Sequence, residues 1–289
     1  MTTIARNLQD VRARIATACQ LAGRNVEEVT LLAVSKTFGA EAVRTAAAAG
    51  QRAFGENYVQ EGIDKIAQLR DLALEWHCIG PLQSNKTRPV AEHFDWVHTV
   101  DRLKIAERLS AQRPEGLGPL NVCIQVNIDG GPTKSGVAPA DALALARAVA
   151  ALPGLKLRGI MTIPEPAPDF EAACAVHARA TALFDQLNAE GLGLDTLSMG
   201  MSADLEAAVA AGSTMVRIGT AIFGVRARSA CWPCLATAPQ CLSSARRGQS
   251  AEGLSGGLAE RMAIVYIKCW VADCEKASPP RASHCMRRE

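Results

Sequence analysis

The sequence of 289 residues contains no uninterrupted apolar stretch of about 20 residues, the length that a membrane-spanning helix needs. Its first residues, MTTIARNLQDVRARIA, mix Arg and Asp through an amphipathic pattern and lack the apolar core of a secretory signal peptide. The net charge is only +2, which does not suggest a partner such as nucleic acid or a membrane surface. These absences favour a globular protein of the cytosol.

Cysteine is sparse over most of the chain. Only Cys19, Cys78, Cys123 and Cys174 precede residue 227, whereas the other six of the ten cysteines follow it. A few scattered cysteines in a long chain are typical of reduced core residues, which again favours the cytosol.

The segment 227–289 differs in composition from the rest, with nine basic and five acidic residues and enrichment in Pro, Ser and Gly. This composition favours a largely disordered extension. Zinc is not expected, because Cys231 and Cys234 form the only pair with C-x-x-C spacing. A redox dithiol is no better supported, since no thioredoxin-like strand and helix surround the pair. We therefore divide the chain into a folded domain, 1–226, and a Cys-rich tail, 227–289.

Within 1–226, short apolar runs alternate with Ala-rich, charged segments that resemble helices. Helices are expected over 40–49 and 203–211, each followed by a glycine, Gly50 or Gly212, where a left-handed C-cap would lie. The expected strands are 29–36, 52–57, 75–80, 95–101, 120–128, 155–164, 196–200 and 215–224.

The connections between the expected strands are too long for hairpins and suit right-handed crossovers between parallel strands. Eight such strands predict an α/β fold with a single (β/α)₈ barrel; a doubly wound open sheet is the alternative. The eighth strand has no clear helix after it. The amphipathic segment 2–22 could fill that gap in the outer ring.

In a barrel of this kind the chemistry lies at the carboxyl ends of the strands. A group of polar residues and glycines falls there, with His77 slightly earlier in its strand. Any one of them could serve only as a loop or capping residue, but their common placement at one rim is harder to dismiss. The group is Lys36, Asn57, Gly80, Asn127, Thr162, Ser198, Gly200 and Arg217.

Two segments near the end of the barrel indicate an anion site. Ser202 lies where a helix N-cap is expected, and an N-cap alone would explain it. Gly219 and Thr220 lie in the loop expected after the eighth strand. Loops after strands seven and eight often bind phosphate through free backbone N–H groups, so together the segments predict a phosphorylated ligand.

Lys36 follows the apolar run Leu31-Leu32-Ala33-Val34 and, with a period of two, would share a strand face with Leu32 and Val34. Either it ends the strand and reaches water, or its amine is required in a sheltered place, where it suits Schiff-base formation with an aldehyde. Arg217 would lie on the face of the eighth strand that points into the barrel, together with Met215 and Gly219. Lysine, arginine and a phosphate site together indicate pyridoxal 5′-phosphate (PLP), which carries both aldehyde and phosphate.

Six segments carry a resemblance to a known family: LLAVSKT, FGENYVQE, WHCIGPLQSNK, TKSG, LSMGMSADLEAA and STMVRIGTAIFGVR. Through them, residues 1–226 closely resemble the pyridoxal phosphate homeostasis proteins, single-domain barrels related to the N-terminal domain of alanine racemase. The resemblance implies a PLP-binding protein of the cytosol that buffers or delivers the cofactor, with apo PLP enzymes as candidate recipients. We expect a monomer with no catalytic residues of its own.

The resemblance also implies a role for individual residues. Lys36 is the expected Schiff-base lysine, and Arg217 is expected near the pyridine nitrogen. The phosphate is assigned to Ser202, Gly219 and Thr220, and the walls of the cofactor pocket to Asn57, His77 and Met199.

This sequence departs from the family pattern at Phe38-Gly39, where a lysine and a proline are expected, and at the loop 129–132, which has few acidic residues. These changes leave the role of a second lysine at the mouth open, with Lys134 as a candidate. The alternative function is an amino-acid racemase. Barrel racemases take a second base from a tyrosine in an additional domain, whereas this sequence has only Tyr58 and Tyr266 and no second folded domain is expected.

Overall fold

The computed structural model describes residues 3–131 and 134–224. In this part of the chain, parallel strands form one closed barrel in sequence order, so the predicted (β/α)₈ barrel is confirmed and an open sheet is excluded. The predicted disorder of 227–289, and the expectation that this segment has neither a zinc site nor a redox dithiol, concern residues outside the described ones. The strands are β1 (Thr30–Val34), β2 (Ala53–Glu56), β3 (Glu75–Cys78), β4 (Trp96–Val100), β5 (Leu120–Val126), β6 (Leu155–Thr162), β7 (Thr196–Ser198) and β8 (Met215–Ile218).

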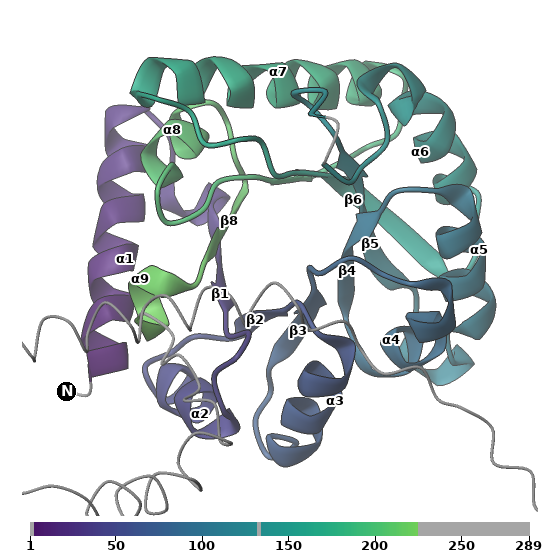
Figure 1. Cartoon of the computed structure of the whole chain (residues 1–289), viewed down its shortest axis with the longest axis horizontal. Helices are drawn as coiled ribbons and strands as arrows, with labels where there is room; N and C mark the ends of the chain where they lie inside the picture. The colour runs from purple at the N-terminus through teal and green to yellow at the C-terminus, as the bar shows by residue number, and fades with distance from the viewer. Residues whose placement is uncertain (1–2, 132–133, 225–289) are drawn as a thin grey trace, which may run out of the picture. The chain divides into compact units, whose positions relative to one another are not determined.

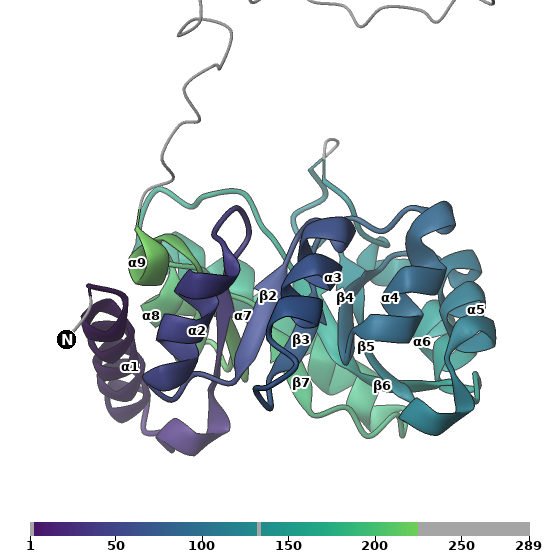
Figure 2. The same ribbon diagram turned by 90° about the horizontal axis from the view of Figure 1, so that it is seen from below.

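Helices surround the barrel on its outer side (Figures 1 and 2). One helix precedes β1, and the others follow the strands in turn. They are α1 (Thr3–Leu21), α2 (Ala40–Ala48), α3 (Val59–Gln68), α4 (Thr87–His93), α5 (Leu103–Gln112), α6 (Ala142–Ala150), α7 (Phe170–Ala189), α8 (Leu205–Ala210) and α9 (Thr220–Phe223).

The N-terminal helix α1 completes the outer ring, as predicted. It contacts α2, α8 and α9, and Figure 1 shows it along the side of the barrel next to the short α9. Leu8, Val11 and Ile15 recur at three- and four-residue spacing and are buried by this contact. Because α9 has only four residues, α1 covers the part of the barrel that a full eighth helix would cover.

Two of the predicted boundaries are wrong. The eighth strand ends at Ile218 rather than at 224, because the backbone of Gly219 turns and α9 starts at Thr220. The helix predicted over 203–211 begins at Leu205, and its N-cap is Asp204 rather than Ser202. The Asp204 carboxylate accepts the N–H of Met201 at 2.7 Å and thereby stabilises the turn that precedes the helix.

Side chains of the strands alternate between the helices and the barrel interior, as the period of two requires. Outward residues such as Phe54 and Val97 belong to the large core between strands and helices. Inward residues form two small apolar clusters, one around Leu32 and Val34 and one around Trp96. The rest of the interior is polar, which is unusual for a packed barrel and points to the functional site.

Gly159 tests the packing of the barrel wall. A Cβ atom on this residue of β6 would lie 1.6 Å from the carbonyl oxygen of Thr196 on β7. We expect Gly159→Ala to lower the unfolding free energy by about 1–3 kcal/mol, because the two strands must separate. Gly116→Ala is the control, since a Cβ atom there meets nothing within 4 Å. Equal urea midpoints for both variants would contradict the close approach.

Candidate functional site

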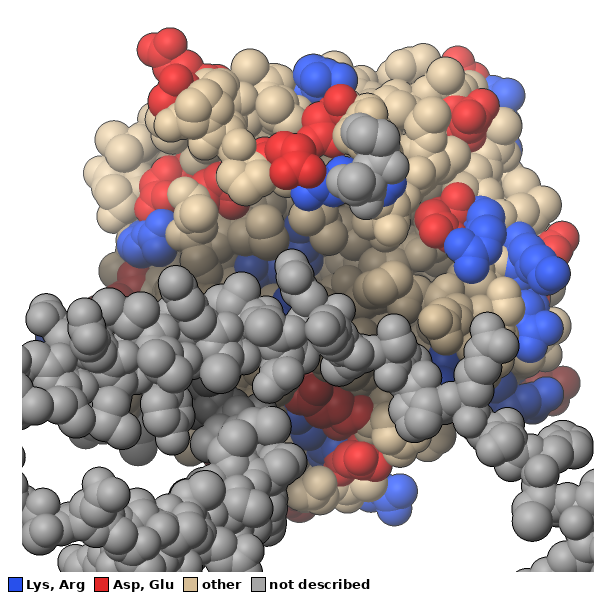
Figure 3. All heavy atoms as spheres, in the orientation of Figure 1, with Lys and Arg blue, Asp and Glu red and all other residues tan. Residues whose placement is uncertain are grey.

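All strands are parallel, so their carboxyl ends open at one mouth of the barrel. Figure 3 looks onto this end and shows a hollow in the surface with Lys or Arg atoms, in blue, inside it. Side chains that follow different strands can therefore meet here although they are far apart in the sequence. This is the end at which the sequence places its candidate residues.

The closure of the barrel brings the first and last groups of candidates together. In the pairing of β1 with β8, Leu32 lies opposite Arg217 and Ala33 lies opposite Ile218. A Cβ atom on Gly219 would lie 3.1 Å from the carbonyl oxygen of Val34. The turn that carries Lys36 thus starts beside the loop that leads into α9.

Four other predicted residues lie at the same end. Asn57 follows β2 directly, and Ser202 lies in the turn between β7 and α8. Gly219 is the N-cap of α9, and Thr220 is the first residue of that helix. They follow β2, β7 and β8, which with β1 are consecutive strands of the closed barrel, so these residues lie along one part of the mouth.

Lys36 is half-buried and lies in a turn, two residues after the end of β1. Lys36 therefore lies beyond the strand that was expected to carry it, and it is partly exposed. The next residue, Thr37, has a φ angle of 69°, which non-glycine residues rarely adopt. The Thr37 N–H donates to the carboxylate of Glu61 at 2.6 Å, which holds this strained turn in place.

The backbone of the Lys36 turn is also held by a second lysine. The ammonium of Lys65 donates to the carbonyl oxygen of Ser35 at 2.8 Å and to carboxylate oxygens of Glu56 and Glu61 at 2.7 Å each. The hydroxyl of Ser35 donates to the same oxygen of Glu56 at 2.6 Å. Lys65 and Glu56 are both buried, 4% and 1% exposed, so this is a charge pair inside the protein.

Burial raises the pKa of Glu56, and the charge and hydrogen bond of Lys65 oppose that rise. Burial of a charge is costly unless the charge is paired, so each of these residues requires the other. The sequence analysis missed this pair. Its signal was weak: Lys65 and Glu61 have the four-residue spacing of an ordinary surface ion pair on a helix.

Arg217 points into the barrel from β8 and is 5% exposed. Its guanidinium donates to the carbonyl oxygen and hydroxyl of Ser198, at 2.7 and 2.9 Å, and to the carbonyl oxygen of Thr162 at 2.8 Å. All three acceptors are neutral, and no carboxylate of the described residues is hydrogen-bonded to it. Burial lowers the pKa of Arg217 to about 10, so the group stays cationic at neutral pH.

His77 is fully buried in the barrel interior rather than at the rim. Its ring contacts His98, with 2.9 Å between Nδ1 of His77 and Nε2 of His98, and the carboxylate of Glu75 at 2.7 Å. The ring of Trp96 stacks on it with centroids 5.2 Å apart. His98 in turn contacts the hydroxyl of Ser198 at 3.0 Å, so His77 is connected to Arg217 through other side chains.

Met199 is the predicted residue whose side chain lies elsewhere. It is fully buried, and it belongs to the core between the strands and the outer helices together with Leu197. Ser198, between them, faces the barrel interior. As a side-chain contact to a ligand at the mouth, Met199 is therefore not supported by this arrangement.

Three buried polar atoms at the mouth have no hydrogen-bond partner among the described residues. They are Oδ1 of Asn57, Oδ1 of Asn127 and Oγ1 of Thr162, which follow or end β2, β5 and β6. Buried polar atoms are rarely left without a partner, so these atoms favour a polar ligand at this place. A cavity of about 220 Å³ opens beside them and is lined by Asn57, Thr99, Gln125 and Lys134, among others.

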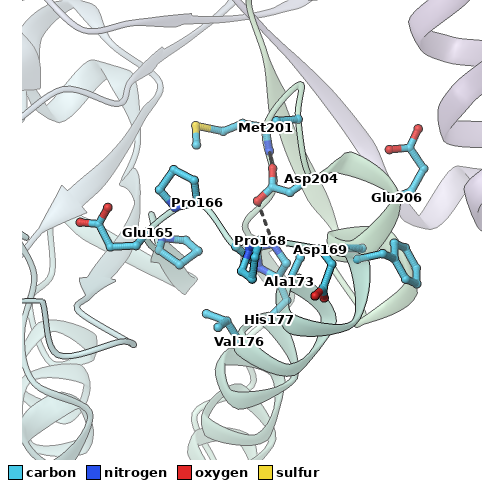
Figure 4. Close-up of a pocket in the computed structure, with 15 residues that line it drawn as sticks. Glu165, Pro166, Pro168, Asp169, Ala173, Val176, His177, Met201, Asp204 and Glu206 are labelled. Atoms are coloured by element: carbon cyan, nitrogen blue, oxygen red, sulfur yellow. Dashed lines mark hydrogen bonds and ion pairs between the residues drawn. The ribbon is translucent and has the colours of Figure 1, made fainter.

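Lys134, the candidate second lysine, lies at the rim of this cavity, and its ammonium pairs with Glu165 at 3.1 Å. A larger cavity of about 330 Å³ lies outside the barrel mouth, between α7 and the turn before α8 (Figure 4). It is lined by prolines and by His177, which contacts Asp204 at 2.9 Å. None of the predicted site residues lines it.

Two other kinds of site are not seen within residues 3–131 and 134–224. No three side chains of His, Cys, Asp or Glu are grouped so that they could hold a metal ion there. No helix of that part combines the length and the hydropathy needed to cross a membrane.

Comparison with known proteins identifies the family. The model of the alanine racemase N-terminal domain matches residues 6–227. The pyridoxal phosphate homeostasis protein of Pseudomonas aeruginosa is 63% identical over 226 residues, which cover 78% of this chain and 97% of that protein. The chain belongs to the pyridoxal phosphate homeostasis protein family. The member from Escherichia coli K12 is 57% identical over 229 residues, covering 78% of this chain and 98% of that protein.

Solved structures agree with this membership. PipY of Synechococcus elongatus, a structure solved with PLP bound, is 40% identical, with a TM-score of 0.67 over 76% of this chain and 100% of that chain. The same protein solved without PLP gives 41% identity and a TM-score of 0.68. An alanine racemase from Corynebacterium glutamicum, 22% identical with a TM-score of 0.58, shares the fold alone.

The buried pair of Lys65 and Glu56 gives a prediction for this family member. We expect Lys65→Met to lower the unfolding free energy by about 3–5 kcal/mol, because it leaves the Glu56 charge buried without its partner. The double variant Lys65→Met, Glu56→Gln should recover a large part of that loss. Urea unfolding of both variants measures this, and a double variant as unstable as the single one would contradict the pairing.

Proposed function

We propose that this protein binds PLP at the carboxyl end of its barrel, with Lys36 as the residue that bonds the cofactor, and that it serves PLP homeostasis. The observation that carries the proposal is the full-length likeness to PipY, whose structure holds PLP, together with Lys36 and Arg217 at one mouth. The names of two curated relatives, which are 63% and 57% identical to this chain, support the same role. Delivery to apo PLP enzymes of the cytosol, by a monomer, remains part of the proposal.

When bound, PLP would supply an aldehyde, the group that can bond covalently to a lysine amine with release of one water, and Lys36 would hold it. Lys36 supports this role because its turn is fixed by Glu61 and by Lys65, while its own side chain is only half-buried. Because the backbone of this turn is already fixed, Lys36 can direct its amine toward the mouth without the entropy cost of ordering the backbone when the ligand binds.

For the phosphate, we assign the turn with Ser202 and the segment Gly219-Thr220. The first N–H groups of a helix have no acceptor inside the helix, so those at the start of α9 are available to an anion. The small Gly219 lets this backbone lie close to Val34. Its place beside the Lys36 turn supports one ligand that reaches both, with phosphate at one end and aldehyde at the other.

For the ring, Arg217 supplies a cation whose described partners are all neutral. Such a cation favours an acceptor atom or negative charge next to it. The unpartnered oxygens of Asn57 and Thr162 add polar contacts at the same mouth, and His77 supports the site from below through its chain of contacts. The residues present therefore fit a flat, polar, anionic cofactor.

A carrier is favoured over a racemase by what surrounds Lys36. Racemisation requires two positioned acid–base groups, one for each face of the substrate carbon. Within the described residues, Tyr58 is the one tyrosine that could serve as such a group. It is 60% exposed at the start of α3 and belongs to the barrel itself, not to a second domain. Arg217 also cannot readily give a ring nitrogen a full proton, because its pKa, about 10, stays far above neutrality.

The first prediction concerns the lysine. Borohydride treatment of the PLP-loaded protein should fix the cofactor to Lys36, as found by peptide mass mapping. Lys36→Ala should abolish the fixed adduct without loss of folding, since it removes a half-buried side chain. Lys104→Ala, on the exposed face of α5, is the matched control and should retain the adduct. An adduct that persists at another lysine in Lys36→Ala would refute the assignment.

The second prediction concerns catalysis. Incubation of the PLP-loaded protein with L-alanine should give little or no D-alanine by chiral chromatography, because a second acid–base group is lacking in the proposed site. Turnover of about 1 s⁻¹ or faster, abolished by Lys36→Ala, would overturn the carrier function in favour of the racemase.

A further inference from the structure

An unbroken row of polar side chains crosses the barrel interior from one end to the other. Glu75 and His77 come from β3, His98 from β4, Ser198 from β7 and Arg217 from β8. The contacts join Arg217 to Ser198 at 2.9 Å, Ser198 to His98 at 3.0 Å, His98 to His77 at 2.9 Å and His77 to Glu75 at 2.7 Å. We refer to these five residues as the interior chain.

The two ends of the interior chain differ in exposure. Glu75 is the first residue of β3, at the opposite end of the barrel from the mouth, and its side chain is 48% exposed. His77 and His98 are 0% exposed, and Arg217 is 5% exposed. The interior chain thus runs from solvent at the amino end of the strands to the cation of the proposed cofactor site.

The chemistry of the two ends, together with a neutral His77, fixes the direction of every hydrogen bond between them. A guanidinium can only donate, and an ionised carboxylate can only accept. Glu75 therefore requires a proton on Nε2 of His77. If His77 is neutral, its Nδ1 accepts from Nε2 of His98; the Nδ1 of His98 then accepts from the hydroxyl of Ser198, which in turn accepts from Arg217.

The surroundings keep the two imidazoles neutral. Burial lowers the pKa of His77, and the neighbouring Glu75 opposes this. Burial places the pKa of His98 well below its usual range, and the charge of Arg217, with that of His77 whenever His77 is protonated, lowers it further. The hydrogen bond from His77 lowers the pKa of Glu75, which keeps that carboxylate ionised.

We infer that Glu75, His77, His98 and Ser198 are positioning residues that hold the guanidinium of Arg217 for its ligand through hydrogen bonds of one fixed direction. That Arg217 faces the ring of PLP rests on the proposed function. The direction of the hydrogen bonds does not, because it follows from the protein alone.

A proton added to His77 reverses the middle of the interior chain. Both ring nitrogens of His77 then donate, so His98 must accept at Nε2 and carry its own proton at Nδ1. The Ser198 oxygen then receives donors from both His98 and Arg217, and its own hydrogen must leave the chain. The charged groups of other elements that act on these rings and on Glu75 are Asp95, Arg158 and Arg217.

The sign of the pH effect follows. Lowered histidine pKa values stabilise the folded barrel above about pH 6.5, the usual value for histidine. As the pH falls below that value, the unfolded chain binds protons that the folded interior excludes, so stability is lost. Protonation of the pair should also loosen Arg217, and PLP should therefore be released more readily in acid.

The direct test uses the protein without PLP. Long-range ¹H–¹⁵N spectra report which ring nitrogen of each histidine carries the proton, and His93→Gln and His98→Gln assign the signals. At neutral pH we expect protons on Nε2 alone for both His77 and His98. A proton on Nδ1 of neutral His98, or a doubly protonated His77, would overturn the fixed direction.

A second test measures the effect on the ligand. Ser198→Ala should weaken PLP binding about tenfold, the effect of one lost hydrogen bond to a charged group. Ser198→Thr should restore it, because the hydroxyl returns. The matched control is Thr196→Val, on the same strand and the same inward face, whose hydroxyl instead contacts Asp195 at 2.7 Å.

Three outcomes decide the inference. PLP affinity unchanged in Ser198→Ala, or lowered equally in Thr196→Val, would show that the hydroxyl does not position Arg217. If Ser198→Ala does not fold, Glu75→Gln, at the half-exposed end of the interior chain, replaces it as the test variant. In Glu75→Gln we expect neutral His98 to be able to carry its proton on Nδ1. Failure of the unchanged protein to bind PLP would refute the proposed function, while the spectra of the free protein would still test the direction.

Discussion

The pairing of β1 with β8 is the constraint on which the site depends. It joins residues almost two hundred positions apart and closes the barrel. Without closure, Arg217 and the loop at Gly219 would lie on a sheet edge, away from the turn of Lys36. Closure also removes the exposed edges of the sheet and leaves one mouth at which all carboxyl ends converge. The outer ring is completed by α1, which packs against α2, α8 and α9 where a full eighth helix is missing.

Two buried charges lie next to this mouth, and they are stabilised in different ways. Lys65 is paired with carboxylates, which keeps it out of the chemistry and makes it an anchor for the Lys36 turn. Arg217 has neutral acceptors only, so its charge is balanced only in part by the protein. A buried cation whose charge is only partly balanced can bind an anionic ligand, whereas a buried cation paired with carboxylates stabilises the fold. This difference supports the proposal that Arg217 binds the ligand while Lys65 holds the turn of Lys36.

The sequence predicted most of the fold, whereas the residues it assigned to the site stay predictions. Apolar runs, long connections and capping glycines such as Gly50 were enough to predict eight strands and the role of α1, because these depend on local pattern. The predicted end of the eighth strand was wrong because the backbone turns at Gly219. The predicted start of the helix after strand seven was wrong because one hydrogen bond of Asp204 stabilises a turn there. Ser202 was assigned as an N-cap from its type, but the helix begins later, at Leu205, after a turn that the Asp204 carboxylate stabilises by accepting the N–H of Met201.

The rest of the site could not be predicted because it arises from contacts between distant strands. His98 lies two residues after Trp96 in an unremarkable strand, and only the barrel places it between His77 and Ser198. The same holds for Lys65, which looks like a surface residue of a helix. Met199 shows the opposite error: resemblance placed it in the pocket, whereas the alternation of β7 turns its side chain toward the outer core.

The central claim is that one PLP molecule occupies the mouth between Lys36 and Arg217. A crystal structure of the full chain grown with PLP tests it most directly. The account predicts electron density continuous from Nζ of Lys36 to the cofactor, its phosphate at Ser202 and Gly219-Thr220, and its ring nitrogen at the guanidinium of Arg217. Density for PLP elsewhere, for example in the cavity of Figure 4 beside His177, with an empty mouth, would contradict it.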